Sequence, residues 1–271
     1  MAVDAQKSAM HSPLALLDAV EQREIIVEYQ AIFPITGADP IGFEALIRWD
    51  HPVAGRLAPA DFLPCDMGND IGSVLTNYVL EEATRQCSIW RRGGLDVGVS
   101  VNIAPGRMAD QILPPHIATL LERHHLAPNL LTVEITESRC TTGPRGIARA
   151  LAGLASIGVR LSLDDFGTGE SSLSRLRHLQ FDEIKIDRSF VTDVATCTTD
   201  RNIVTFITDL GHSLGMSVVA EGIEDQVCQE VLIHLGVDRA QGFHCHRPAV
   251  AACIDGQFAV GRGPTRPLTS P

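Results

Sequence analysis

The chain lacks the features that mark a secreted or membrane-spanning protein. No uninterrupted apolar run approaches the roughly 20 residues of a membrane helix, and the first residues show no basic segment followed by an apolar one, as a secretory signal would. The seven cysteines are odd in number and form no Cys-x-x-Cys pair, a pattern typical of reduced thiols. We therefore expect a cytoplasmic protein with no membrane span.

Positive charge is also scarce. The 271 residues include 22 Lys and Arg against 33 Asp and Glu, which gives a formal net charge of −11. This balance disfavours DNA, RNA and anionic membranes as partners, because little positive charge offsets the repulsion from phosphates. A small phosphate ligand stays compatible with it if metal ions bridge the ligand and the protein.

A Gly-x-Gly-x-x-Gly sequence after the first predicted strand is missing too, which weighs against dinucleotide binding. The chain instead has a regular alternation of strand and helix patterns. Residues 25–35 and 41–49 predict a hairpin across a Gly-Ala-Asp-Pro turn. Further strands are predicted at 97–103, 130–135, 159–163, 183–186, 217–220 and 239–240, and helices at 71–91, 106–125, 146–157, 171–177, 200–214 and 226–235.

This alternation indicates a parallel sheet built from strand–helix units. About eight strands in about 250 residues match a TIM-type barrel, and an open, doubly wound sheet is the alternative. We predict an α/β fold, a TIM-like (β/α)8 barrel, whose opening hairpin makes the first strand antiparallel. No linker interrupts the pattern, so we expect a flexible tail at 1–13, one domain at 14–250 and a peripheral, Gly- and Pro-rich tail at 251–271.

One predicted strand ends in two adjacent carboxylates. Residues 161–169 read Leu-Ser-Leu-Asp-Asp-Phe-Gly-Thr-Gly, so Asp164 and Asp165 follow an apolar run, and Gly167 permits a tight turn behind them. Neighbouring carboxylates repel and resist ionisation unless a cation lies between them. Capping of a following helix is the structural alternative.

Similar polar residues interrupt or end most of the other strands. Strand ends of a barrel converge on one face, where active sites lie. The residues concerned are Glu44, Asn102, Glu134, Asp164, Asp165, Lys185, Glu221 and Gln241. Oxygen ligands without His or Cys suit Mg²⁺ or Mn²⁺, and the number of acids indicates two ions, as used for displacement at phosphorus. Lys185 and Arg48 add positive charge for a phosphate, whereas any one strand-end acid alone is more typical of a salt bridge or helix cap.

The motifs around these residues resemble those of a known family. They are Glu44-Ala45-Leu46 with Arg48-Trp49, then Ser-Val-Asn, Glu-Ile-Thr-Glu-Ser, Asp-Asp-Phe-Gly-Thr-Gly, Lys-Ile-Asp, Val-Ala-Glu-Gly-Ile-Glu and Gln-Gly-Phe. In this order, over residues 14–248, the chain resembles the EAL family of cyclic di-GMP phosphodiesterases. The resemblance implies a TIM-like barrel with an antiparallel first strand. It also implies hydrolysis of cyclic di-GMP to linear 5′-pGpG with Mg²⁺ or Mn²⁺.

The resemblance further implies metal-binding and catalytic roles by motif position. The metal ligands would be Glu44, Asn102, Glu134, Asp164, Asp165 and Glu221. Asp164 would be shared between two ions. Lys185 would position or polarise the attacking water, and Gln241 would lie near that water. Glu221 would bind metal or water, or act as the general base.

Substrate contacts and loop support follow from the same resemblance. Leu46, Arg48 and Asp187 would contact the substrate, with Arg48 meeting a phosphate. Glu137 and Glu224 would support the loop after Asp164-Asp165. Family members often dimerise near this loop, so a homodimer through it is a further expectation.

Several positions depart from the family pattern. Ala31 replaces a usual Pro, Glu170 replaces a usual aromatic residue, and residues 64–70 read Pro-Cys-Asp-Met-Gly-Asn-Asp. None of these changes removes a metal ligand, which favours an active phosphodiesterase. The alternative is a catalytically silent domain that acts as a cyclic di-GMP receptor or protein-interaction module. His244 and His246 share one face of an extended segment, where a packing role is favoured over a transition-metal site.

Overall fold

The opening hairpin forms as the β-branched runs predict. The computed structural model describes residues 12–63, 69–108, 110–136, 144–168 and 180–258. Strands β1 (Ile25–Pro34) and β2 (Gly42–His51) pair antiparallel, in a register that runs from Ile25 opposite Trp49 to Ile32 opposite Gly42. Alternate residues of β2 therefore face opposite sides of the sheet, with Glu44 on one side and Phe43 on the other.

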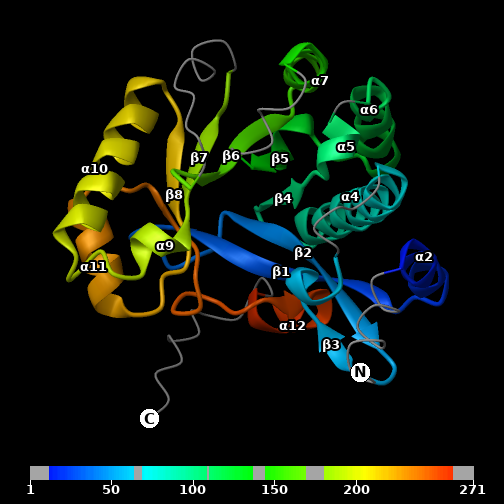
Figure 1. The fold of residues 1–271 in the computed structure, drawn as a ribbon, viewed down its shortest axis with the longest axis horizontal. Helices are drawn as coiled ribbons and strands as arrows, with labels where there is room; N and C mark the ends of the chain where they lie inside the picture. The colour runs from blue at the N-terminus through cyan, green and yellow to red at the C-terminus, as the bar shows by residue number, and fades with distance from the viewer. Residues whose placement is uncertain (1–11, 64–68, 109, 137–143, 169–179, 259–271) are drawn as a thin grey trace.

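The remaining strands close the sheet into a barrel (Figure 1). In spatial order after β2 they are β4 (Gly98–Asn102), β5 (Leu131–Thr136), β6 (Arg160–Phe166), β7 (Glu183–Ile186), β8 (Ser217–Ala220) and β9 (Arg239–Ala240). Every neighbouring pair from β2 to β9 is parallel, and β1 pairs antiparallel with both β2 and β9. The predicted TIM-like barrel with an antiparallel first strand is confirmed, and the open-sheet alternative is wrong.

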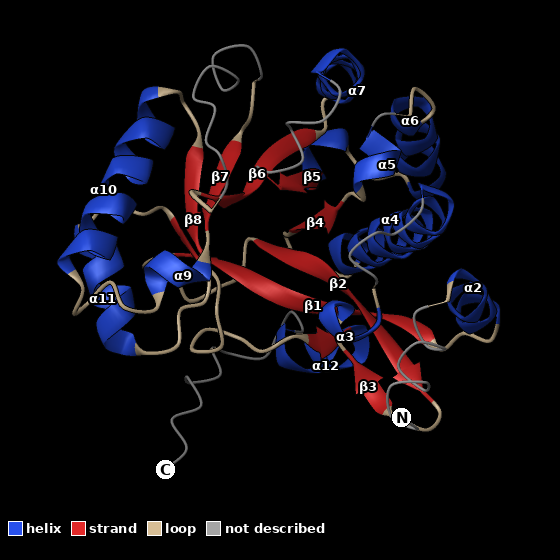
Figure 2. Cartoon of the chain, viewed as in Figure 1, coloured by secondary structure: helices blue, strands red, loops and turns tan. Residues whose placement is uncertain are grey.

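Helices cover the outside of the barrel (Figure 2). They are α4 (Asn69–Arg92), α5 (Pro105–Met108), α6 (Leu113–His124), the 3-10 turn η1 (Pro128–Leu130), α7 (Pro144–Ile157), α9 (Arg188–Val191), α10 (Thr198–Ser213) and α11 (Gln226–His234). The single helix predicted at 106–125 is divided into α5 and α6, because Pro114 and Pro115 lie in the first turn of α6, the position that tolerates proline. The helix predicted at 171–177 lies outside the described residues. No helix among the described residues is both long and apolar enough to cross a bilayer.

A smaller apolar cluster lies beside the hairpin. Helix α2 (Pro13–Glu21) begins after Ser12, whose hydroxyl accepts a hydrogen bond from the Ala15 amide at 3.2 Å. Helix α3 (Pro59–Phe62) follows the short strand β3 (Gly55–Leu57), which pairs with β2. The buried residues of the cluster are Leu16, Ala19, Ile25, Trp49, Phe62, Ile71 and Leu75. This packing fixes α2 against the domain from Pro13 onward.

The C-terminal segment differs from the prediction of a peripheral tail at 251–271. Strand β10 (Ala249–Val250) pairs with β1, and residues 251–258 form helix α12 (Ala251–Phe258). Ile254 of α12 is fully buried, and Trp90 donates a hydrogen bond to Asp255 at 2.7 Å. The prediction of a tail rested on the polar, Gly- and Pro-rich composition after Pro248. Residues 251–258 nevertheless form a short helix whose Ile254 and Phe258 share one face. Residues 259–271 lie outside the described part of the chain.

Candidate active site

The polar strand-end residues converge at one end of the barrel, as predicted. Each is held by the strand that precedes or contains it, so the closed sheet sets their spacing. The contributors are Glu44 on β2, Asn102 on β4, Glu134 on β5, Asp164 on β6, Lys185 on β7, Glu221 just after β8 and Gln241 just after β9. Asn102 donates to Glu44 at 2.7 Å, and Gln241 donates to the other oxygen of Glu44 at 2.6 Å.

Lys185 lies at the centre of this group with a fully buried side chain. Its ammonium is 3.2 Å from Glu44, 3.0 Å from Glu134, 3.6 Å from Asp164 and 2.5 Å from Glu221. Burial alone would lower the pKa of Lys185, but attraction to Asp164, Glu134 and the other acids raises it well above its ordinary value. The lysine therefore carries its charge at any ordinary pH.

One ammonium does not balance the surrounding carboxylates. Burial and the negative charge of Glu44 raise the pKa of Glu134 well above its ordinary value. Burial, with repulsion from Asp164, raises the pKa of Glu221 to about 8 in spite of Lys185. Glu44 is the exception, because attraction to Lys185 and hydrogen bonds from its neighbours outweigh burial and lower its pKa. These shifts report a buried excess of negative charge.

The adjacent Asp164 and Asp165 both reach the site. Successive side chains of a regular strand point to opposite faces, yet oxygens of Asp164, Asp165 and Glu221 lie within 4.8 Å of one another. A register shift between β6 and β7 after Leu163 and a left-handed backbone at Asp165, with φ 54°, account for this. Burial and the neighbouring Asp164 raise the pKa of Asp165.

The donor set fits hard divalent cations. Among the described residues, Glu134 Oε1 and Asp164 Oδ1 are buried without a hydrogen-bond partner, and Asp164 Oδ1 has only the Lys185 ammonium nearby, at 3.6 Å, so each offers an oxygen that could coordinate an ion. Carboxylate and amide oxygens are the ligands that Mg²⁺ and Mn²⁺ take in proteins. The residues present therefore agree with the predicted oxygen-only site.

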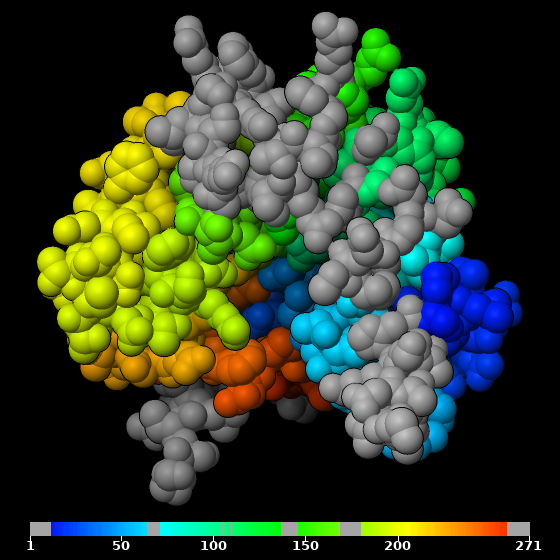
Figure 3. All heavy atoms as spheres, in the orientation of Figure 1, coloured from blue at the N-terminus to red at the C-terminus, as the bar shows by residue number. Residues whose placement is uncertain are grey.

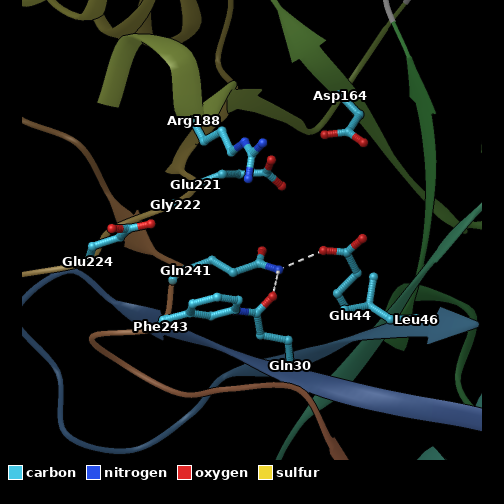
Figure 4. A pocket seen from close by; sticks show the side chains of 11 residues that line it. Gln30, Glu44, Leu46, Asp164, Arg188, Glu221, Gly222, Glu224, Gln241 and Phe243 are labelled. Carbon is cyan, nitrogen blue, oxygen red and sulfur yellow. Dashed lines mark hydrogen bonds between the residues drawn. The ribbon is translucent and has the colours of Figure 1, made fainter. Parts of the chain in front are cut away.

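A cavity of about 270 Å³ opens beside this cluster. Its lining is Gln30, Glu44, Leu46, Asp164, Arg188, Glu221, Gly222, Glu224, Gln241, Gly242 and Phe243. On the face shown in Figure 3 the surface is hollowed between the barrel segments, with atoms of the hairpin visible at depth. Figure 4 shows Asp164, Glu221 and Glu44 on three sides of the space, with Gln241 between Glu221 and Gln30.

The cavity includes residues that the sequence reasoning missed. Arg188 directly follows the Lys-Ile-Asp motif, and Phe243 ends the Gln-Gly-Phe motif, so their neighbours gave a usable signal. Gln30 lies on β1 directly opposite Glu44, where a polar residue in an apolar strand was also a signal. A side chain at Gly222, where φ is 69°, would place its Cβ 2.4 Å from Cβ of Arg188, so the glycine lets Arg188 reach the cavity.

Two predicted substrate contacts, Arg48 and Asp187, do not line the cavity and have other partners. Arg48 forms an ion pair with Glu28 at 2.9 Å, on the β1 strand. Asp187 caps α9 by accepting a hydrogen bond from the Ser189 amide at 3.0 Å. Glu137 lies outside the described residues, as does Glu170.

The sequence of the chain matches known proteins over most of its length. Residues 14–248 match the family model of the EAL domain. The chain is 38% identical over 237 residues to the bifunctional diguanylate cyclase/cyclic di-GMP phosphodiesterase MucR of Pseudomonas aeruginosa. This alignment covers 87% of the chain and 35% of MucR. It is 33% identical over 241 residues to the signaling protein YkoW of Bacillus subtilis, covering 88% of the chain and 30% of YkoW. The chain thus spans about a third of the length of these curated relatives.

Solved structures of similar proteins share the same barrel. The PaMucR phosphodiesterase in complex with c-di-GMP superposes with a TM-score of 0.84 at 38% identity, over 89% of this chain and 99% of that one. The EAL enzyme Bd1971, with cAMP and cyclic-di-GMP bound, superposes with a TM-score of 0.86 at 25% identity, over 94% of this chain and 70% of that one. With the family match spanning 14–248 and the barrel and its acidic end in agreement, the chain belongs to the EAL domain family.

Proposed function

We propose that this protein hydrolyses cyclic di-GMP to linear 5′-pGpG with two divalent cations, Mg²⁺ or Mn²⁺. The observation that carries the proposal is the unbalanced charge at the barrel end, where one buried ammonium faces the carboxylates of Glu44, Glu134, Asp164 and Glu221. With Asp165 beside them and all five carboxylates ionised, as bound cations would favour, the excess over one ammonium is four negative charges, the charge of two divalent ions. The similarity to the PaMucR phosphodiesterase supports the choice of substrate.

The strand-end oxygens would hold the two ions. One ion would be held by Glu44, Asn102, Glu134 and Asp164, and the other by Asp164, Asp165 and Glu221. Bound cations would neutralise the phosphodiester charge, increase the acidity of the attacking water and stabilise the leaving oxygen. Lys185 holds the acids together, and its fixed positive charge would position that water. Glu221, 2.5 Å from Lys185, would bind an ion or accept the proton of the water.

The rim of the cavity offers contacts for a guanine nucleotide. Arg188 is exposed and lines the cavity, which suits a phosphate oxygen. The ring of Phe243 is half exposed and also lines it, while Arg247 lies 4.5 Å from its centroid. An aromatic ring in this place would stack on a guanine base. Leu46 would contact the substrate from the cavity wall, and Arg48 and Asp187 would do so only after leaving their present partners.

Three further proposals concern the setting of this activity. Glu224 lines the cavity and would support the loop after Asp165, together with Glu137. A homodimer through that loop stays a prediction, because residues 169–179 lie outside the described part of the chain. Free thiols at Cys87 and Cys228 agree with a cytoplasmic location.

The proposal is tested by incubating the protein with cyclic di-GMP and Mg²⁺ and following pGpG by chromatography. Metal-dependent formation of pGpG is the expected result, and EDTA should stop it. Binding of cyclic di-GMP without product, in either metal, would contradict hydrolysis and favour the receptor alternative. Calorimetric titration with the same nucleotide separates these two results from an absence of binding.

A further inference from the structure

A chain of three polar groups leads from the main chain to the centre of the site. Gln30 donates through Nε2 to the main-chain oxygen of His246 at 3.0 Å. Gln241 donates through Nε2 to Gln30 Oε1 at 3.2 Å and to Glu44 Oε2 at 2.6 Å. Both glutamines are buried, and Figure 4 shows the side chain of Gln241 between Gln30 of the hairpin and Glu221.

The carbonyl at the start of this chain determines the orientation of both amides. A main-chain carbonyl only accepts hydrogen bonds, so Gln30 must turn its NH₂ group toward His246. Gln30 then presents its oxygen to Gln241, and Gln241 must turn its own NH₂ group toward Gln30 and Glu44. Within the part of the chain that the structure describes, the oxygen of Gln241 is left buried and without a partner in the cavity wall.

We propose that Gln30 is a positioning residue that holds Gln241 with its amide oxygen toward the cavity. There the oxygen accepts a hydrogen bond from the attacking water and orients it. The opposite orientation of Gln241 would place two oxygens against each other at Glu44, and Gln30 prevents it. The catalytic part of this inference rests on the proposed hydrolysis, whereas the orientation of the amides does not.

The carbonyl of His246 is itself fixed by α12. His246 Nε2 lies 2.8 Å from Gln257 Oε1, and its ring centroid is 5.7 Å from that of Phe258. Its other ring nitrogen accepts a hydrogen bond from the Ala31 amide at 3.5 Å. Both ring nitrogens of His246 thus have hydrogen-bond partners, which agrees with the structural role favoured over a transition-metal site. Helix α12 lies beyond the residues 14–248 that match the family.

The first test is a kinetic double-mutant cycle with Gln30→Met and Gln241→Met. Methionine keeps the length of the side chain and removes its polar atoms. Gln30→Met is expected to lower kcat by about tenfold or more, with KM changed by less than about twofold, and to have no further effect on kcat in the Gln241→Met protein. An equal loss of kcat in both backgrounds, or a rise in KM alone, would show that Gln30 acts on the substrate or the fold instead.

The second test does not need hydrolysis. In EDTA, urea unfolding of the same variants is expected to give non-additive midpoints, with the double variant losing less than the two single losses together. Gln226→Leu, which removes an exposed glutamine that donates a hydrogen bond to Glu230, should be additive with Gln241→Met. If the wild-type protein formed no pGpG, the proposed function would fail while this cycle still measured the amide chain. Additive midpoints for Gln30 and Gln241 would overturn the positioning role.

The third test addresses α12 with a variant that is not expected to affect folding, because Gln257 is exposed. Gln257→Leu should lower kcat by about two- to fivefold at unchanged KM and should have no effect in the Gln241→Met background. The matched variant Gln226→Leu should leave kcat at the wild-type value. A Gln257→Leu protein with wild-type kcat would remove α12 from the inference.

Discussion

Glu183 and Lys185 lie on the same strand, β7, and their surroundings differ sharply. Both side chains are buried and, two positions apart, point to the same side of the sheet. Among the described residues, Glu183 has one partner of opposite charge, Arg239, on β9. Lys185 instead faces four carboxylates. A buried charge by itself is thus weak evidence for function, whereas an unbalanced one indicates that a cation or substrate completes the site.

The largest effect is expected from Lys185→Met. Loss of the ammonium removes the positive charge that holds the acids and the water, so kcat should fall by about a thousandfold or to background. The measurement is pGpG formation in saturating Mg²⁺, with circular dichroism as the check on folding. A folded variant with wild-type turnover would show that Lys185 is only structural. Asp164→Asn and Glu44→Ala should likewise abolish turnover.

Glu183→Gln should have the opposite outcome. It leaves Arg239 without its acid, so the free energy of unfolding should fall by about 2–3 kcal/mol, less than for a fully buried pair because Arg239 is partly exposed. Turnover of the folded variant should stay within about twofold of the wild type, since the pair lies away from the cavity. Urea unfolding and the pGpG assay give the two values. Loss of turnover without loss of stability would contradict this separation.

Addition of divalent cations should distinguish the balanced Glu183–Arg239 pair from the acids around Lys185 in the absence of substrate. Mg²⁺ or Mn²⁺ at about 100 times its dissociation constant should raise the free energy of unfolding by about 2.7 kcal/mol, because the ion binds only the folded acids. Glu183→Gln should keep this increase, and Asp164→Asn should lose most of it. Thermal unfolding with and without EDTA is the measurement, and an equal increase in all three proteins would place the ion elsewhere.

A further effect is expected on the pH dependence of the stability of the metal-free protein. The pKa of Glu221 rises from 4.5 to about 8 on folding, so between these values the folded state binds a proton that the unfolded state has released. Stability contributed by this proton is present at low pH and declines as the pH rises toward 8. Glu221→Gln should flatten the decline in EDTA-containing buffer. If the free energy of unfolding of Glu221→Gln fell with pH as steeply as that of the wild type, the decline would come from other titrating groups.

Much of the fold could be predicted from local patterns. The hairpin follows from two β-branched runs around a turn, and the site follows from acids that interrupt apolar strands, because the barrel brings strand ends together. The approach of both Asp164 and Asp165 required a left-handed residue and a register shift, which the sequence alone does not show.

Long-range partners could not be predicted. Arg48 is predicted to meet a substrate phosphate, and its ion pair with Glu28 on the neighbouring strand could not be foreseen from the sequence. The partner of Gln30 is the main chain of His246, 216 positions away, and no periodicity connects the two. Helix α12 was missed because its eight residues adjoin a Gly- and Pro-rich stretch that dominated the composition.

Helix α12 has a consequence for how this domain can be exchanged between proteins. Phe258 lies with its ring centroid 6.3 Å from that of Phe33 and 5.9 Å from that of Phe43, on the side of the hairpin opposite Glu44. A recombination event that joined another partner after Pro248 would keep every motif of the family. It would also remove α12 and expose Phe33, Phe43 and Trp90 to water. The new neighbouring segment would then have to bury these rings. The packed structure therefore continues beyond the residues 14–248 that carry the motifs.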